Sequence, residues 1–176
     1  MQVFFHTVFN LLPYHILAYG ALLGTELFQS FVNTQICCGV LPMCEFVTLQ
    51  KRLFPAYFQC QVGLVILTAA TRPPYSIFSF IEDLWGTVVL VIALVAGTLN
   101  WAVFGPRATT AAIDRRSLQE QARSAKSTDI LDSSLLRRAS REFSVNHAAS
   151  IHLNAISLIA TVCYAFSLAS SIVAES

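Results

Sequence analysis

The sequence predicts an all-α integral membrane protein: a four-helix transmembrane bundle with a helical, basic cytosolic loop between the third and fourth spans. Three observations support this prediction. Of the 176 residues, 55% are hydrophobic and only 12% are charged, and the mean hydropathy is +0.61, unlike a soluble domain. Four segments are apolar over lengths that can cross a bilayer. The basic residues are concentrated in one connection, which indicates the orientation of the spans.

The third apolar segment is the clearest span. Residues 84–104 carry no charged side chain, and Trp85 and Trp101 lie near the two ends of the segment. At about 1.5 Å per residue, a helix of this length is about 30 Å long, which matches the hydrocarbon core of a bilayer. We expect Gly105 and Pro106 to stop this span.

The other three spans are expected at about residues 14–41, 53–71 and 147–173, with Pro55 in the first turn of the second. Gln59 and Gln61 interrupt the second segment. If this segment were only a re-entrant hairpin and did not cross the membrane, the two termini would lie on opposite sides of the membrane. Residues 1–13 are expected to form an N-terminal interfacial segment that is retained, and residues 14–176 a single membrane domain.

The distribution of Lys and Arg predicts the orientation. Eight of the eleven basic residues lie between Arg107 and Arg141, Lys51 and Arg52 fall in the first predicted connection, and only Arg72 falls in the second. The positive-inside rule therefore places the first and third connections in the cytosol and both termini outside or in a lumen. The third connection, residues 105–146, is expected to form two short helices that extend the neighbouring spans. An endomembrane location is favoured, but the sequence does not identify the organelle.

Three of the spans have faces that should point toward the interior of the bundle. On a helical wheel, one arc of the first span is almost entirely polar. It contains His15, Tyr19, Leu22, Glu26, Gln29, Ser30, Asn33 and Cys37. The fourth span repeats this pattern with His147, Ser150, Asn154, Ser157, Thr161 and Tyr164, and the third combines small residues with an amide at Gly86, Ala93, Ala96, Gly97 and Asn100.

These faces have two interpretations. In the first, the polar groups satisfy one another in a packed bundle. In the second, they form a polar pathway or a small-ligand site between spans one, three and four. Glu26 is the strongest candidate for a functional residue, because an acidic side chain near midmembrane costs on the order of 2.5–3.5 kcal/mol. The polar residues of the cytosolic half could converge into one cluster, which would comprise Asn33, Gln59, Asn100, His147, Ser150 and Asn154. His15 and Tyr19 lie toward the opposite surface.

Other patterns predict surface contacts. Arg137, Arg138 and Arg141 form a basic group that could contact anionic lipid or a protein partner, and Ser140 follows a basic sequence typical of kinase sites. Gly20 and Gly24 form a small-residue pair at which a second copy of the protein could dock.

The sequence favours no catalytic or cofactor chemistry. No nucleophile elbow, zinc-protease motif or phosphate-binding loop occurs, so the chain is not expected to be an enzyme. Cys37, Cys38, Cys44 and Cys60 could offer soft ligands for Cu(I), but they form no C-x-x-C pair, and we predict neither a metal nor a cofactor. No feature indicates a nucleic-acid partner.

Several short motifs resemble one known family, the transmembrane protein 205-like family (domain of unknown function 4149). The matching elements are His15, Tyr19-Gly20, Gly24, Phe31-Val32, Leu41-Pro42, Leu49-Gln50, Leu53-Phe54-Pro55-Ala56-Tyr57-Phe58, Asn100-Trp101, Pro106, Thr109-Thr110, Phe143, His147, Ser150 and Asn154. The resemblance spans nearly the whole chain, and it implies a four-span membrane protein without an established general activity. This chain departs from the family pattern at Glu26, Met43 and Ala148, which moves attention to His15, Asn100, His147 and Asn154.

The leading hypothesis is therefore a membrane scaffold, assembly or trafficking factor whose basic cytosolic loop contacts lipid or a partner. The alternative is a transporter or channel-like protein for a small solute, a proton or a soft metal, lined by the polar residues of spans one, three and four.

Overall fold

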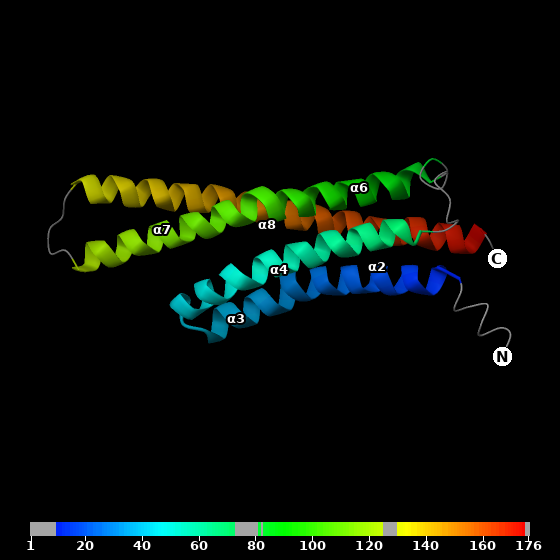
Figure 1. Ribbon diagram of the computed structural model, residues 1–176, viewed down its shortest axis with the longest axis horizontal. Coiled ribbons are helices and arrows are strands. Elements are labelled where there is room, and N and C mark those ends of the chain that lie inside the picture. Colours follow the sequence, from blue (N-terminus) through cyan, green and yellow to red (C-terminus); the bar gives the residue numbers. More distant parts are fainter. Residues whose placement is uncertain (1–9, 73–80, 82, 125–129, 175–176) are drawn as a thin grey trace.

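The computed structural model describes residues 10–72, 81, 83–124 and 130–174, and the regular elements in these ranges are all helical. The helices run along one common direction, and the start of α2 (Leu12–Leu27) lies at the same end of the molecule as the end of α8 (Ile130–Ala174) (Figure 1). Three helices of the described residues are long and apolar enough to cross a membrane. Their bounds are Met43–Ala70, Leu84–Arg123 and Ser134–Ser170.

The first helical run consists of three segments without a break. It comprises α2, the π-helix η1 (Phe28–Asn33) and α3 (Thr34–Val40). The side chain of Asn10 accepts a hydrogen bond from the Leu12 N–H (2.9 Å) where the run begins. Leu41 is extended (φ −90°, ψ 141°), as expected for a residue before proline, and this conformation ends the run.

The helix α4 (Met43–Ala70) begins directly after Pro42 and is 28 residues long. Lys51 and Arg52 therefore lie within α4, which begins ten residues before the predicted start of the second span. Pro55 lies in the interior of α4, so the prediction that it occupies the first turn is wrong. The helix begins twelve residues before Pro55, at Met43, and not close to Leu53 as predicted. Proline removes one backbone hydrogen bond near the exposed residues Lys51 and Arg52, where polar surroundings can replace it.

The third run consists of α6 (Leu84–Leu99), the π-helix η2 (Asn100–Phe104) and α7 (Gly105–Ser124). It continues through Gly105 and Pro106, where the sequence predicts a stop. The N–H of Gly105 donates to the carbonyl of Asn100, which is the wider spacing of a π-helix. A Cβ at Gly105 would lie 2.6 Å from that carbonyl oxygen, so the position requires glycine.

The helix α8 is 45 residues long, or roughly 68 Å, and is more than twice as long as the hydrocarbon core is thick. α6 and then α7 pack along it, while α2 packs against α4. The two helix pairs meet where α2 contacts α8 and α4 contacts α6. At the other end, the hairpin of α3 and α4 diverges from the hairpin of α7 and α8 (Figure 1).

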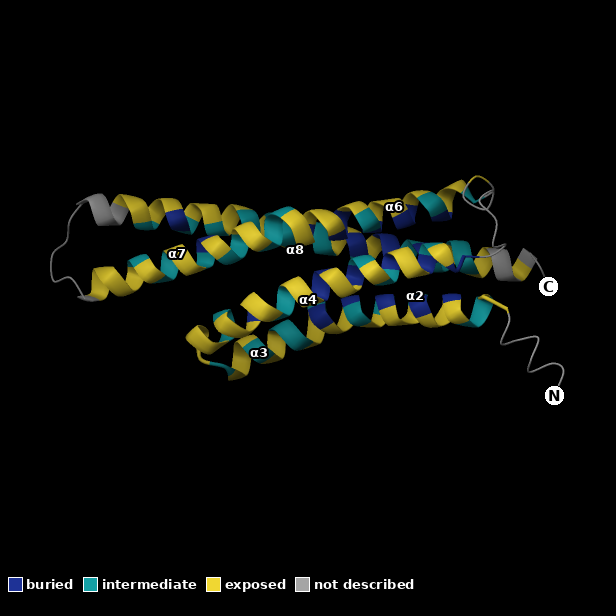
Figure 2. Cartoon of the chain, viewed as in Figure 1, coloured by how far each residue is buried: buried dark blue, intermediate teal, exposed yellow. Residues whose placement is uncertain are grey.

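The core is small and the apolar surface is large. The core cluster is centred on Leu22, Val65, Val89, Leu90, Ala93, Ala160 and Tyr164. Exposed residues cover most of the outer faces of the helices (Figure 2), and these faces include Leu17, Phe28, Phe31 and Trp85. A soluble monomer does not expose apolar surface on this scale, whereas lipid chains cover it. The protein is therefore an integral membrane protein. The predicted interfacial residues 1–9 lie outside the described residues.

Candidate functional site

The polar faces meet in a buried hydrogen-bonded triad at the centre of the bundle. Glu26 on α2, Gln61 on α4 and Ser157 on α8 are completely buried. Oε1 of Glu26 accepts hydrogen bonds from Nε2 of Gln61 (2.6 Å) and from the hydroxyl of Ser157 (2.8 Å). Nε2 of Gln61 also donates to Oγ of Ser157 (2.9 Å), so the triad links three helices.

The triad is only partly satisfied. Oε2 of Glu26 and Oε1 of Gln61 are buried without a hydrogen-bond partner among the described residues. The side chain of Thr161 lies close enough to act on the Glu26 carboxyl group. Its hydroxyl is nevertheless not in hydrogen-bonding geometry with any described group. A buried carboxyl oxygen without a partner is uncommon, and it marks this carboxyl group for further attention.

A second polar group lies nearer the end where α2 begins. Nδ1 of His15 lies 3.2 Å from the Thr71 hydroxyl, and Nε2 lies 3.0 Å from the Tyr164 hydroxyl. The Thr71 hydroxyl donates to the Leu67 carbonyl (2.8 Å), so it accepts from His15. The neutral tautomer that fits carries its proton on Nδ1 and accepts from Tyr164 at Nε2. Tyr19 donates to the Thr161 carbonyl (3.3 Å). Tyr19 therefore lies toward the same end of the bundle as His15.

An ion pair with one buried and one partly exposed partner lies at the same end. Arg72, only 4% exposed at the end of α4, pairs with the carboxylate of Asp83, the N-cap residue of α6. Asp83 also accepts from the Gly86 N–H (2.8 Å) and from the Ser167 hydroxyl on α8. Arg72 donates in addition to the Thr87 hydroxyl (2.7 Å). This network therefore ties α4, α6 and α8 together.

The electrostatics of Asp83 follow from these contacts. Burial alone would raise the pKa of Asp83. The hydrogen bonds from Ser167 and from the Gly86 N–H, together with the Arg72 guanidinium, outweigh that effect and hold the pKa below its ordinary value. The carboxylate is therefore the form that the folded protein stabilises.

The polar residues predicted for the cytosolic half do not form a single cluster. Asn154 accepts from the Tyr57 hydroxyl (2.7 Å) and donates to the Ser30 hydroxyl (2.8 Å), which links α8 to both α4 and η1. Asn100 donates to the Ser150 carbonyl (3.1 Å). Asn33 donates to Gln29 within its own helical run (2.8 Å), so it takes no part in this link.

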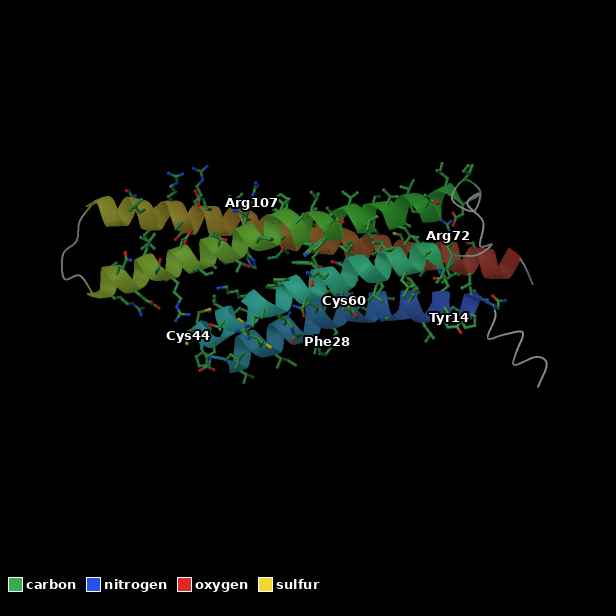
Figure 3. The ribbon with its side chains drawn as sticks, viewed as in Figure 1. Tyr14, Phe28, Cys44, Cys60, Arg72 and Arg107 are labelled. Carbon is green, nitrogen blue, oxygen red and sulfur yellow. The ribbon has the colours of Figure 1, made fainter. Side chains whose placement is uncertain are left out.

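The diverging hairpins enclose a cleft of about 870 Å³. One wall comes from η1, α3 and the first half of α4, and the other from α7 and α8. His147, Ser150 and Asn154 line it, whereas the predicted residue Gln59 is exposed elsewhere. Figure 3 shows Cys44 at this end of α4 and Arg72 at the opposite end. The cleft and the Arg72–Asp83 ion pair therefore lie at opposite ends of the described part of the molecule.

The predicted surface residues lie outside the cleft. Arg137, Arg138 and Arg141 are exposed on α8, and Arg138 pairs with Glu142 (3.1 Å). Ser140 is half-buried. Gly20 and Gly24 are exposed, and no atom would lie within 4 Å of a Cβ at either glycine. No group of three metal-binding side chains occurs among the described residues.

Sequence reasoning missed the roles of four important residues. Gln61 was identified only as an interruption of the second span, although an amide among apolar residues is itself a sign of an interhelical hydrogen bond. Arg72 served only to predict orientation and Asp83 was not singled out, although opposite charges on the two sides of a short connection can pair. The position of Gln50 in the cleft had no signal in the sequence, because it depends on the extension of α4 toward Met43.

Comparison with known proteins supports the motif-based resemblance. The model of the family named domain of unknown function DUF4149 matches residues 17–117. Xanthocillin biosynthesis cluster protein D of Aspergillus fumigatus is 54% identical over 172 residues, which cover 98% of this chain and 97% of that protein. Transmembrane protein 205 of Danio rerio is 29% identical over 98 residues, which cover 54% of this chain and 52% of that protein. No solved structure matches. The match extends over more than half of the sequence and confirms the family identified from the motifs: the chain belongs to the DUF4149 family.

Proposed function

We propose that this protein is a four-span membrane trafficking factor that binds a small amphiphilic molecule in the cleft between its two helical hairpins. The cleft carries the proposal, because a volume of about 870 Å³ lies in the range typical of small-molecule sites. The similarity to a protein named for a biosynthesis cluster supports a role beside small-molecule biosynthesis. In this proposal the chain receives such a molecule at the membrane and holds it there.

The proposed fourth span is the run from α2 to α3. Residues 12–40 form a helical rod about 43 Å long, enough to cross the hydrocarbon core with some tilt. Its Leu17, Phe28 and Phe31 are 59–69% exposed, as lipid-facing side chains would be, while its polar arc faces the bundle. With this span, the open end of the cleft faces the cytosol and the Arg72–Asp83 end faces the opposite side.

The walls of the cleft suit an amphiphile. Phe54, Phe58, Ile113 and Ile151 supply apolar surface, whereas Gln50 and other polar side chains lie on the same walls. Binding sites for small molecules typically combine mainly apolar walls with a few polar groups that set the orientation. The exposed Arg137, Arg138 and Arg141 outside the cleft would then hold the loop against anionic lipid or a partner.

Photo-crosslinking tests this proposal. The protein is placed in nanodiscs of phosphatidylcholine with a diazirine-bearing fatty alcohol, and the crosslinked peptides are mapped by mass spectrometry. We expect crosslinks on α4 and α7 that the unlabelled alcohol competes away. Ala108→Phe and Ala112→Phe fill the cleft and should reduce this crosslinking at least tenfold.

The matched control is Ala155→Phe, which adds the same ring to an exposed position of α8 outside the cleft. It should leave the crosslinking unchanged. Equal crosslinking in the wild type and in both cleft-filled variants would contradict the proposal, because the probe would then only partition into the surrounding lipid.

Solute or proton transport is a second candidate, and the unpartnered Oε2 of Glu26 favours it. A carboxyl group in a water-poor bundle can carry a proton across one step of a pathway. Transport predicts that Glu26→Gln abolishes flux in proteoliposomes while the protein still inserts and folds. A purely packed interior predicts no flux by the wild type, and Glu26→Leu should then only destabilise the fold, since two donors lose their acceptor.

A further inference from the structure

The cleft contains polar groups that select among amphiphiles. We propose that it recognises a single-chain amphiphile with an anionic head group, a carboxylate or a phosphate, held between the amide of Gln50 and the basic side chains of the cleft. This inference rests on the proposed function and adds the chemical class of the ligand. Three observations carry it: an unpartnered buried amide, an excess of positive charge, and a cleft volume suited to a small ligand.

Gln50 is the most specific of these observations. Its side chain is 94% buried on α4, since only 6% of it is exposed, and it lines the cleft. Neither Nε2 nor Oε1 has a hydrogen-bond partner among the described residues. A buried amide without partners costs free energy, and a ligand oxygen in the cleft would remove that cost. Carboxylates and phosphates supply the acceptors that Nε2 needs, and their protonated forms can also donate to Oε1.

The charge of the cleft selects for an anion. Four basic side chains line it, Lys51, Arg115, Arg116 and Arg123, against one carboxylate, Glu120. Arg116 pairs with Glu120 (2.8 Å), so the single acidic group is already matched. Lys51 directly follows Gln50 in the chain and has no ion-pair partner among the described residues. Charges of one sign in a cleft with low-dielectric walls concentrate their field on a ligand of opposite charge.

The remaining groups of the cleft fit the apolar part of the ligand. The guanidinium of Arg115 lies over the Phe143 ring (5.4 Å to the centroid), which places a cation next to aromatic surface. Phe54, Phe58 and Ile151 line the cleft as well. Its volume of about 870 Å³ suits a drug-sized molecule, which favours one chain over the two chains of a bilayer phospholipid.

The experiment compares head groups on one chain. Four diazirine probes share the same alkyl chain and carry a carboxylate, a phosphate, a hydroxyl or a trimethylammonium group. Each is crosslinked to the full-length protein in phosphatidylcholine nanodiscs, and the half-saturating concentration is measured. We expect the carboxylate and phosphate probes to bind about tenfold more tightly than the hydroxyl probe, and the cationic probe to bind most weakly.

Two pairs of variants locate the selectivity. Lys51→Gln should remove about tenfold of the affinity for the anionic probes and leave the hydroxyl probe unchanged. Gln50→Leu should also remove about tenfold for the anionic probes and weaken the hydroxyl probe less, because a neutral hydroxyl makes the weaker hydrogen bond. The matched controls Arg52→Gln and Gln59→Leu change the same residue types at exposed positions outside the cleft, and should bind as the wild type does. Gln50 has no hydrogen bond to lose, so Gln50→Leu should fold, and a melting curve checks this.

The outcomes separate the two proposals. Equal binding of all four head groups, abolished by Ala108→Phe, would overturn the anionic ligand and leave the trafficking function standing. Crosslinking that Ala108→Phe does not reduce for any probe would overturn both. Competition by a two-chain phosphatidic acid as effective as that by the single-chain phosphate would overturn the single-chain assignment.

Discussion

Glu26 has a fully buried carboxyl group, and its neighbours explain how the bundle accommodates it. Gln61 and Ser157 together donate two hydrogen bonds to Oε1, so three helices meet at one oxygen atom. The sequence predicted the face on which Glu26 lies, because polar residues at helical spacing share one side of a rod. It could not predict Gln61 as the partner, because the relative rotation of two helices is set by packing of side chains far apart in the chain.

The ion pair between Arg72 and Asp83 gives a pH dependence. The pKa of Asp83 is lower in the folded protein than its ordinary value, so the contribution to stability is present above about pH 4. It is lost as the pH falls through the lowered folded-state pKa. We expect the melting temperature of the wild type in detergent to fall between pH 5 and pH 2 (about the range in which carboxyl groups titrate).

The comparison variant is Asp83→Asn, which keeps the size of the side chain and removes its charge. It should melt at a lower temperature near neutral pH and lose less on acidification, since the two proteins differ only in this one carboxyl group. Parallel curves for the two proteins would show that this carboxylate contributes nothing to the acid sensitivity.

At the scale of the helices, the π-helical segments explain the largest errors of the sequence prediction. Glycine followed by proline normally ends a helix, and Gly105 and Pro106 predicted a stop. η2 supplies a wider turn whose hydrogen bond from Gly105 to Asn100 lets the helix continue into α7. The apolar pattern reveals the length of the span, whereas the local change from α- to π-helical spacing depends on tertiary contacts.

A glycine on α6 leaves room for the side chains of the ion-pair network. A Cβ at Gly86 would meet the Asp83 carboxylate, and it would lie 2.6 Å from Oγ of Ser167 and 2.8 Å from Arg72. We therefore expect Gly86→Ala to lower the free energy of unfolding by about 1–3 kcal/mol, as overpacking typically does. Thermal unfolding in nanodiscs measures the change.

Gly63→Ala on α4 provides the control, because no atom would lie within 4 Å of its Cβ. It should be neutral or slightly stabilising, since alanine is the better helix former. If Gly63→Ala destabilised the protein as much as Gly86→Ala, the close approach of α6 to the ion pair would not be the cause.

For the whole molecule, composition was sufficient to predict an all-helical integral membrane protein, because lipid admits few other solutions for such a chain. The inward position of Ala93, Ala96, Gly97 and Asn100 also followed from residue size and spacing. The cleft did not, because it arises where two hairpins diverge, and that geometry depends on the extra length of α4, α7 and α8. Patterns along one helix carry no information about the distance between two hairpins.

The central claim is a four-span protein whose cleft opens to the cytosol, and labelling of single cysteines tests it most directly. Cysteine replaces Asn10, before α2, or Ser117, exposed on α7, in a chain whose five native cysteines are changed to serine or alanine. An impermeant maleimide is added to sealed cells, to cells in which only the plasma membrane is permeabilised, and to cells in which all membranes are permeabilised. The account predicts that the Ser117 position reacts only from the cytosol and the Asn10 position only from the opposite side. Reaction of both positions from the same side would contradict it.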